Sequence, residues 1–203
     1  PAGETRDGYY SSVFFDCLQN AGRRFAVGSM LFDGVDPAKP LFCHIGFDFP
    51  HTPVLPPRDY RDRFRNQTYR VPVLDKTELL SMSKQMRKQV AQGYSDHLTD
   101  DEKQTMIQDY YAFCAYGDSL VGQSADAFIQ YSEERDQPWV IVYVCGDHGW
   151  KLGEHGSWCK QTNYDIDVHV PLLMRVPAIS AEGARCNRLV ELVDLFPTLC
   201  DVA

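Results

Sequence analysis

Residues 145–169 concentrate the side chains that could do chemistry. The segment contains three of the six histidines, two of the three tryptophans and four glycines. These residues are His148, His155, His169, Trp150, Trp158, Gly146, Gly149, Gly153 and Gly156. Glycine supplies the backbone freedom that a loop needs to close around a ligand. A connecting loop has no need for this density of imidazole, indole and glycine, so the segment is the first candidate for a functional site.

Asp147 and His148 follow directly on an apolar, β-branched run, residues 139–145, which is typical of a buried strand. A carboxylate and an imidazole fixed at the end of a strand can share one divalent cation, because the strand holds their geometry. Lys160 lies 13 positions after Asp147. If the chain folds back, its ammonium can hold an anionic group and neutralise charge on a leaving oxygen.

Each of these residues also has an ordinary structural explanation. Asp147 can cap a turn, His148 can be a hydrogen-bonded core histidine, and Lys160 can be a solvated surface lysine. His155 and His169 remain open, Glu154 can hold a backbone amide, and the two tryptophans can pack the loop. A zinc site from Cys145, His148, His155 and Cys159 is a weak alternative, because the spacing matches no common zinc module.

The surrounding pattern predicts an α/β layered domain. We expect helices over residues 11–32, 75–93, 99–132 and 194–199, and strands over 41–46, 139–145, 171–176 and 189–193. Thr99 and the acids after it predict the start of the longest helix. Residues 47–59 contain four prolines and predict a stiff loop that carries His51. His51 can also simply cap this loop. Ligands in such folds gather where loops leave the carboxyl ends of strands.

The composition limits the partners of the chain. The 203 residues are 44% hydrophobic and 24% charged, with a formal net charge of −8. This acidity disfavours nucleic acid as a partner but allows a small anion in a locally basic site. No apolar run approaches the ~20 residues of a membrane span, so no membrane partner is expected. The seven cysteines form no Cys-x-x-Cys pair, which favours mostly buried free thiols over a disulfide framework.

Five motifs in order resemble the sulfatase family of the alkaline-phosphatase-like superfamily, and within it the iduronate-2-sulfatase subgroup and related bacterial sulfatases. They are Phe-Pro-His-Thr-Pro at 49–53, Gly-Asp-His-Gly at 146–149, Leu-Gly-Glu-His-Gly-x-Trp-x-Lys at 152–160, His-Val-Pro-Leu at 169–172, and residues 189–199. The resemblance is clear over 37–203. It implies that residues 1–203 are the C-terminal part of one catalytic domain, with an alkaline-phosphatase-like layered fold. The implied central sheet is mostly parallel or mixed, has helices on both faces and is incomplete at its N-terminal side.

The resemblance also implies roles for four residues. Asp147 and His148 match ligands of the family's metal, calcium, although a histidine ligand is unusual for calcium and leaves Mg²⁺, Mn²⁺ or an indirect role for His148 open. Lys160 and His51 match groups that contact the sulfate. The implied reaction is hydrolysis of a small anionic sulfate ester, such as a sulfated sugar, in a periplasmic, secreted or lysosomal compartment.

The family's nucleophile is a formylglycine made from the Cys or Ser of a Cys/Ser-x-Pro/Ala-x-Arg motif, and none of the seven cysteines fits that motif. We therefore expect the N-terminal half of the same protein to be a partner, and the chain alone to be inactive. Two alternatives remain open: a phosphonate or phosphodiester hydrolase of the same superfamily, and a non-catalytic sulfatase-like domain.

Overall fold

The computed structural model describes residues 5–91, 97–177, 179 and 183–202. Its α-helices are α1 (Arg6–Gln19), α2 (Arg58–Phe64), α3 (Lys76–Ser81), α4 (Lys84–Ala91), α5 (Asp100–Glu133), α6 (Asp165–Val168) and α7 (Leu195–Val202). Short 3₁₀ turns lie at Glu154–Gly156 and Leu192–Asp194. The strands are β1 (Arg24–Val27), β2 (Met30–Asp33), β3 (Ile141–Val144), β4 (Lys151–Leu152), β5 (Trp158–Cys159) and β6 (Leu172–Arg175).

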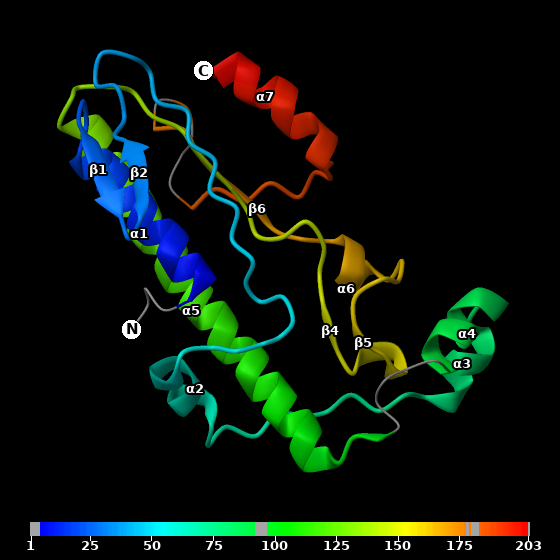
Figure 1. The fold of residues 1–203 in the computed structure, drawn as a ribbon. Coiled ribbons are helices and arrows are strands. Elements are labelled where there is room, and N and C mark those ends of the chain that lie inside the picture. Colours follow the sequence, from blue (N-terminus) through cyan, green and yellow to red (C-terminus); the bar gives the residue numbers. More distant parts are fainter. Residues whose placement is uncertain (1–4, 92–96, 178, 180–182, 203) are drawn as a thin grey trace.

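Helix α5 is the spine of the molecule (Figure 1). It begins as predicted: the Thr99 hydroxyl accepts from the Glu102 backbone amide, and the Glu102 carboxylate accepts from the Thr99 amide. This reciprocal capping satisfies two amides that the first turn of a helix leaves unpaired. One face of α5 buries Phe113, Tyr116 and Leu120, so this face belongs to the core.

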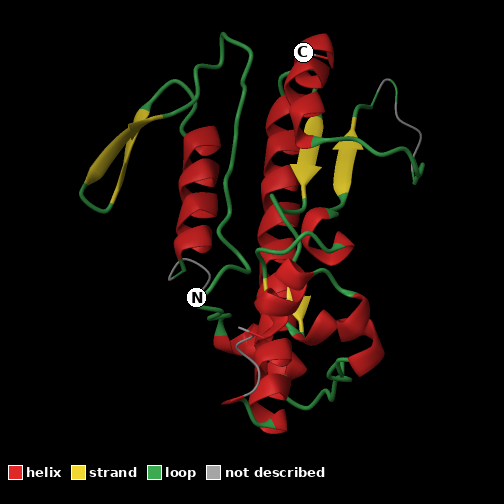
Figure 2. Cartoon of the chain, turned by 90° about the vertical axis from the view of Figure 1, so that its right-hand side faces the viewer, coloured by secondary structure: helices red, strands yellow, loops and turns green. Residues whose placement is uncertain are grey.

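Helix α1 packs along α5 through a second apolar cluster of Phe14, Leu18 and Tyr131. The prediction of a helix over 11–32 is wrong in its second half. There the chain forms the β1–β2 hairpin, which Figure 2 shows on the side of α1 away from α5. Gly28 lies in the hairpin turn at φ +60°, a conformation that glycine adopts at little cost.

Strand β3 pairs with β6 in antiparallel register, from Ile141 opposite Arg175 to Val144 opposite Leu172. The predictions of strands near 139–145 and 171–176 are therefore confirmed. Alternating helices and strands agree with an α/β fold. The three strand pairs among the described residues are antiparallel and two-stranded, so the sheet in this part of the chain is small.

Two predicted strands are wrong. Residues 41–46 form no regular element, and Phe42 is 79% exposed. Residues 189–193 run into a 3₁₀ turn with Leu189 and Val193 on the surface. An apolar run becomes a strand only where a neighbouring strand takes its backbone hydrogen bonds, and these runs have no such neighbour in the described part of the chain. The predicted final helix is confirmed as α7, which begins directly after Asp194.

The helix predicted over 75–93 is divided into α3 and α4 (Figure 1), and its last two positions, 92 and 93, lie outside the described residues. The break falls at Met82, whose backbone is extended and whose side chain is buried. Its sulfur accepts a hydrogen bond from the Tyr164 hydroxyl at 3.2 Å. This contact ties the α3–α4 segment to the loop after β5. No helix among the described residues is both long and apolar enough to cross a membrane.

Candidate active site at the end of strand β3

Asp147 and His148 lie in a tight turn directly after β3. The turn is anchored where the Cys145 amide donates to the Pro171 carbonyl at 3.1 Å, which continues the β3–β6 pairing. Gly146 has no room for a side chain, because a Cβ atom there would lie 2.8 Å from the His148 carbonyl oxygen. The sequence therefore folds here into a turn that holds the carboxylate and the imidazole at the strand end.

A short hairpin brings Lys160 back to the same place. Strands β4 and β5 pair antiparallel, with Lys151 opposite Cys159 and Leu152 opposite Trp158. The Lys160 ammonium then donates to Nε2 of His148 at 3.1 Å. The structure thus brings Asp147, His148 and Lys160 together, although 13 positions separate the first from the last.

The hydrogen bonds of His148 give its two ring nitrogens different roles in this arrangement. Its Nδ1 lies 2.8 Å from the Gly149 carbonyl oxygen, which can only accept, so Nδ1 is the donor to that oxygen. Its Nε2 then presents a lone pair to the Lys160 ammonium. The Asp147 Oδ1 lies 3.4 Å from the same Nε2. The imidazole thus stands between a carboxylate and an ammonium.

Trp150 forms the wall beside these groups. Its ring stacks on Tyr110 of α5 with centroids 6.0 Å apart and on His148 at 6.4 Å. The Lys160 nitrogen lies 6.0 Å from the Trp150 centroid, at the outer limit of a cation–π contact. Burial raises the pKa of the Tyr110 hydroxyl, so this residue stays neutral. The indole thus packs the loop against α5, which was the structural role open for Trp150.

Asp147 and His148 fit part of a divalent cation site. Two ligands about 2.3–2.6 Å from a calcium ion, at nearly a right angle, lie about 3.3–3.7 Å apart, and Oδ1 and Nε2 are 3.4 Å apart. The Asp147 side chain is 85% exposed and free to turn toward a cation, whereas that of His148 is 32% exposed. The described residues contain no group of three or more His, Cys, Asp or Glu side chains that could hold a metal, so a complete shell needs further oxygen ligands.

His51 lies in the proline-rich loop, whose position depends on α1. The buried Asp7 carboxylate accepts from the backbone amides of Asp48 at 2.7 Å and Phe49 at 3.1 Å. His51 itself is exposed, and its Nδ1 lies 2.7 Å from the Thr52 carbonyl oxygen. This is a contact within the loop, as the capping alternative for His51 describes. Asp7 is a residue that sequence reasoning missed, because its partners lie more than forty positions away.

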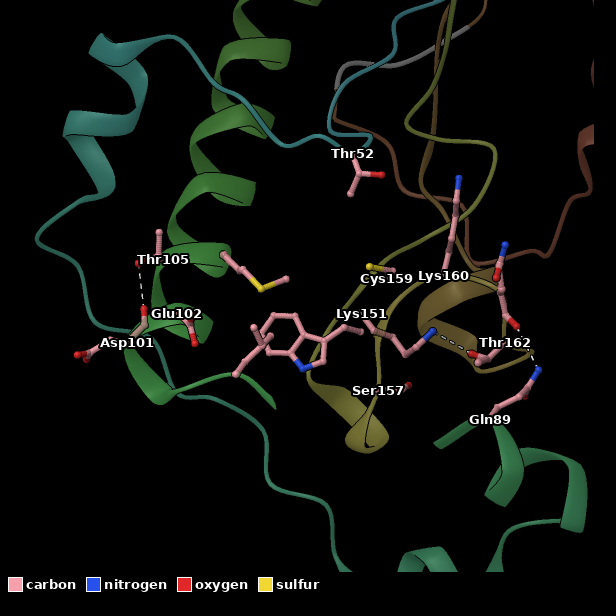
Figure 3. Close-up of a pocket in the computed structure, with 14 residues that line it drawn as sticks. Thr52, Gln89, Asp101, Glu102, Thr105, Lys151, Ser157, Cys159, Lys160 and Thr162 are labelled. Atoms are coloured by element: carbon pink, nitrogen blue, oxygen red, sulfur yellow. Dashed lines mark hydrogen bonds between the residues drawn. The ribbon is translucent and has the colours of Figure 1, made fainter. Parts of the chain in front are cut away.

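A cavity of about 1010 Å³ opens beside Lys160. Thr52 from the proline-rich loop and Lys160 lie on one side of it, and Asp101, Glu102 and Thr105 of α5 lie on the opposite side (Figure 3). The cavity therefore joins the loop that carries His51 to the hairpin that carries Lys160. It is large enough for a ligand of drug or monosaccharide size.

The remaining candidates of the segment have structural contacts. Glu154 accepts from the Leu152 amide at 2.6 Å, the backbone role considered for it. His155 bonds the Glu78 carboxylate through Nδ1 and stacks on Tyr164 with centroids 4.0 Å apart. His155 thus faces α3 rather than the cysteines of the zinc alternative. All seven cysteines are unpaired, and Cys43, Cys145, Cys186 and Cys200 are exposed, so the expectation of mostly buried thiols is wrong.

The structure also joins three residues that the sequence did not single out. Lys151 and Asp167 are buried and form an ion pair that includes Thr162. A Lys followed 16 positions later by an Asp, as here, is a common pattern in any sequence. No signal in one sequence distinguishes such a pair from two surface charges.

Comparison with known proteins gives a consistent result. The family model described as Sulfatase matches residues 20–203. The chain is 33% identical to human iduronate 2-sulfatase over 127 residues, which cover 51% of the chain and 22% of that protein. It is 27% identical to mouse iduronate 2-sulfatase over 202 residues, which cover 82% of the chain and 36% of that protein. Mouse arylsulfatase K is 28% identical over 183 residues, which cover 83% of the chain and 32% of that protein.

Among solved structures, the fold matches the phosphonate monoester hydrolase of Silicibacter pomeroyi. The TM-score is 0.66 with 21% identity, over 98% of this chain and 38% of that one. At this identity the match shows the fold alone, which is α/β as expected. The chain spans less than two fifths of the length of these relatives. With a family match over nearly its whole length, the chain belongs to the sulfatase family.

Proposed function

We propose that the complete protein hydrolyses sulfate esters, and that residues 1–203 are the C-terminal part of its catalytic domain. One observation carries the proposal: the Lys160 ammonium, the His148 imidazole and the Asp147 carboxylate meet at the end of β3, beside a cavity. This cluster combines an anion-binding cation with a carboxylate that suits a hard metal ion. Both are needed to hold and polarise a sulfate group.

Lys160 is assigned to the substrate. Its ammonium would donate to a sulfate oxygen and, as the ester bond breaks, to the leaving oxygen, where negative charge develops. Lys160 lines the cavity, so this requires only a turn of its side chain away from His148. His51 is assigned to the same sulfate group, and its neighbour Thr52 lines the cavity as well.

Asp147 is assigned to a divalent metal, with His148 as a second ligand or as the residue that holds Lys160. A bound metal would supply positive charge to the sulfate oxygens. Calcium suits this oxygen chemistry, and Mg²⁺ and Mn²⁺ are the alternatives. The single Nε2 lone pair of His148 serves one cation at a time. Ligation by His148 therefore requires that Lys160 has turned to the substrate.

The nucleophile is assigned to a segment outside residues 1–203, because no cysteine of the chain stands in Cys-x-Pro-x-Arg. That segment is the proposed partner of this chain. Apolar side chains on β6 and around α7 are exposed, including Leu173, Leu189 and Phe196. Such a surface fits coverage by a further part of the same catalytic domain. The compartment proposed from the family is periplasmic, secreted or lysosomal.

A phosphonate or phosphodiester hydrolase is the second candidate, favoured by the fold match to a phosphonate monoester hydrolase. The two activities differ in the charge of the reacting group, and Asp147, His148 and Lys160 serve both. The substrate class proposed here is a sulfated sugar or a similar small anion.

The decisive experiment compares turnover of an aryl sulfate and an aryl phosphonate monoester by the full-length protein. We expect the higher kcat/KM with the sulfate ester. Faster turnover of the phosphonate would overturn the sulfatase assignment. Turnover of neither, with no Cys-x-Pro-x-Arg or Ser-x-Ala-x-Arg motif encoded upstream of Pro1, would leave a non-catalytic sulfatase-like domain as the reading.

A further inference from the structure

A buried ion pair lies beside the cavity of the candidate site, which Lys151 helps to line. The Lys151 side chain, on β4, is 0% exposed, and that of Asp167, on α6, is 2% exposed. The Lys151 ammonium donates to Oδ2 of Asp167. A lysine with no exposed side-chain surface is rare, because its charge loses all contact with water. Such a residue persists only where a partner compensates its charge.

Thr162 completes the cluster, which we call the Lys151 clamp and define as Lys151, Thr162 and Asp167. The Lys151 ammonium also donates to the Thr162 hydroxyl at 3.1 Å. The Thr162 amide donates to Oδ2 of Asp167 at 2.8 Å, and the Thr162 hydroxyl donates to the same oxygen. The clamp therefore fixes β4, the loop after β5 and α6 at a single carboxylate oxygen.

The carboxylate of the clamp is ionised. Burial by itself raises the pKa of Asp167, but the hydrogen bonds from Lys151 and Thr162 outweigh burial, and the net effect lowers that pKa. Replacing a buried ion pair by apolar residues of similar volume is often neutral or stabilising. Net stability is therefore a weak explanation for this pair, and the geometry that it imposes is a better one.

That geometry connects to both sides of the candidate site. The Lys151 backbone pairs with Cys159, the residue before Lys160. The Asp167 carbonyl accepts from the Gly149 amide, the residue after His148, at 2.8 Å. Thr162 lies two positions after Lys160. Each element that carries a reacting group is thus held by the clamp at its nearest chain neighbour. Figure 3 shows the hydrogen bond between Lys151 and Thr162 within the clamp.

We propose that Lys151 and Asp167 are positioning residues that set the location of the Lys160 ammonium relative to His148. The catalytic importance of that location rests on the proposed function, but the location itself can be measured without assuming any activity. The clamp acts through Lys160 and His148, and Lys151 and Thr162 also line the cavity beside Lys160. Without it, the β4–β5 hairpin keeps its backbone pairing but loses its fixed angle to the turn at His148. A displacement of about 1 Å at a reacting group can cost 10²-fold in rate.

The test uses two changes with different structural consequences. Asp167→Asn keeps the shape but removes the charge of the clamp. The double variant Lys151→Met with Asp167→Leu replaces the ion pair by apolar groups of similar size, which preserves packing. Asp109→Asn is the matched control, because Asp109 forms an ion pair with Arg61 at 2.7 Å that joins α5 to α2 away from the site.

Two readouts report on Lys160 without any turnover. The first is the ¹⁵N resonance of His148 Nε2 in histidine-labelled protein, which senses the hydrogen bond from Lys160 and is identified by its loss in His148→Gln. The second is protection of Lys160 from acetylation by inorganic sulfate, mapped by peptide mass spectrometry. We expect both clamp variants to lose the hydrogen-bonded signal and to weaken sulfate protection roughly tenfold, while Asp109→Asn retains both.

Thermal unfolding of each variant is recorded alongside. If the double variant folds and keeps the wild-type Nε2 signal and protection, the clamp is only a packing feature and the proposal is overturned. If both clamp variants fail to fold, Thr162→Val decides, because it removes only the hydroxyl from the clamp: an unchanged Nε2 signal in that variant rejects the proposal. Failure of the proposed function would show instead as absence of sulfate-ester turnover by the wild-type full-length protein, with the Nε2 signal intact.

Discussion

At the scale of single residues, the site depends on the one lone pair of His148. Nδ1 is bonded to the Gly149 carbonyl oxygen, so Nε2 is the ring atom that lies near both the Lys160 ammonium and the Asp147 carboxylate. The imidazole can hold an ammonium or take part in metal binding, but not both at once. The charges of Lys160 and Asp147 are separately testable, because Lys160 is assigned to the substrate and Asp147 to a metal ion.

Lys160→Ala should cut turnover of a sulfate ester by the full-length protein roughly 10²-fold or more, because it removes a contact made to charge that develops in the transition state. Steady-state kinetics gives kcat and KM for the variant. Lys84→Ala, an exposed lysine at the start of α4, is the control. Wild-type turnover in Lys160→Ala would show that another group holds the sulfate.

Asp147→Ala should weaken binding of Ca²⁺ by more than roughly 10²-fold and abolish turnover, because a charged ligand contributes more than the outer groups whose loss costs 10–100-fold. Isothermal titration calorimetry of the full-length protein measures the affinity. Asp126→Ala removes an exposed carboxylate of α5 and should leave it unchanged. Equal affinities in the two variants would contradict the metal assignment.

At the scale of elements, the site is built by close contact between the turn after β3 and helix α6. Gly149 lies against α6 so tightly that a Cβ atom would stand 1.8 Å from the Ile166 carbonyl oxygen. The obstacle is backbone, which cannot rotate out of the way as a side chain can. The turn therefore packs directly against the backbone of α6.

Gly149→Ala should lower the free energy of unfolding by about 1–3 kcal/mol, the cost typical of overpacking. Thermal unfolding should then show a fall of several degrees in Tm. Gly122→Ala in α5 is the matched control, because nothing lies within 4 Å of its Cβ position. That variant should gain about 0.5–1 kcal/mol from the helix preference of alanine. A Tm for Gly149→Ala equal to that of the wild type would show that the turn can move away from α6.

At the scale of the whole molecule, α1 positions a loop that lies far along the chain. Asp7 of α1 holds the amides of Asp48 and Phe49, and the Phe49 ring packs so closely on Gly117 of α5 that a Cβ atom there would lie 2.1 Å from it. The proline-rich loop with His51 is thus held between the two helices. This contact places Thr52 at the cavity that Lys160 lines.

The Asp7 contact predicts a pH dependence. Burial raises the pKa of Asp7 above its ordinary value of 3.8, against the lowering effect of the two amide hydrogen bonds. The folded state then binds a proton more tightly than the unfolded state, so the contribution of Asp7 to stability is full below pH 3.8 and is lost as the pH rises through the folded pKa. The free energy of unfolding of the wild type minus that of Asp7→Asn should therefore fall from pH 3.5 to pH 6.

Chemical denaturation at a series of pH values measures this difference. Asp33→Asn, which alters an exposed ion pair with Arg24 in the β1–β2 hairpin, is the control. A difference between wild type and Asp7→Asn that grows as the pH rises would mean that the amide bonds dominate and that the carboxylate is stabilised in the folded state.

The sequence by itself determined the features that depend on local chemistry. The capping residues of α5, the β-branched run of β3 and the glycines after it favour a long helix, a strand and a tight turn through their local chemistry. The five motifs in order also specified the family, because their combination is far more specific than any one of them. The chemical candidates Asp147, His148 and Lys160 were therefore named from the sequence, and their roles stay predictions.

Only the tertiary structure decided which side chains meet. Residues 41–46 and 189–193 have strand-like sequences but no strand neighbour among the described residues, and strand formation depends on that neighbour. Lys151 and Asp167 look like surface charges until burial removes water from both. Asp7 gains its role from amides 41 and 42 positions away. Contacts of this kind depend on the path of the chain, and a local pattern cannot encode that path because the partners are distant in the sequence.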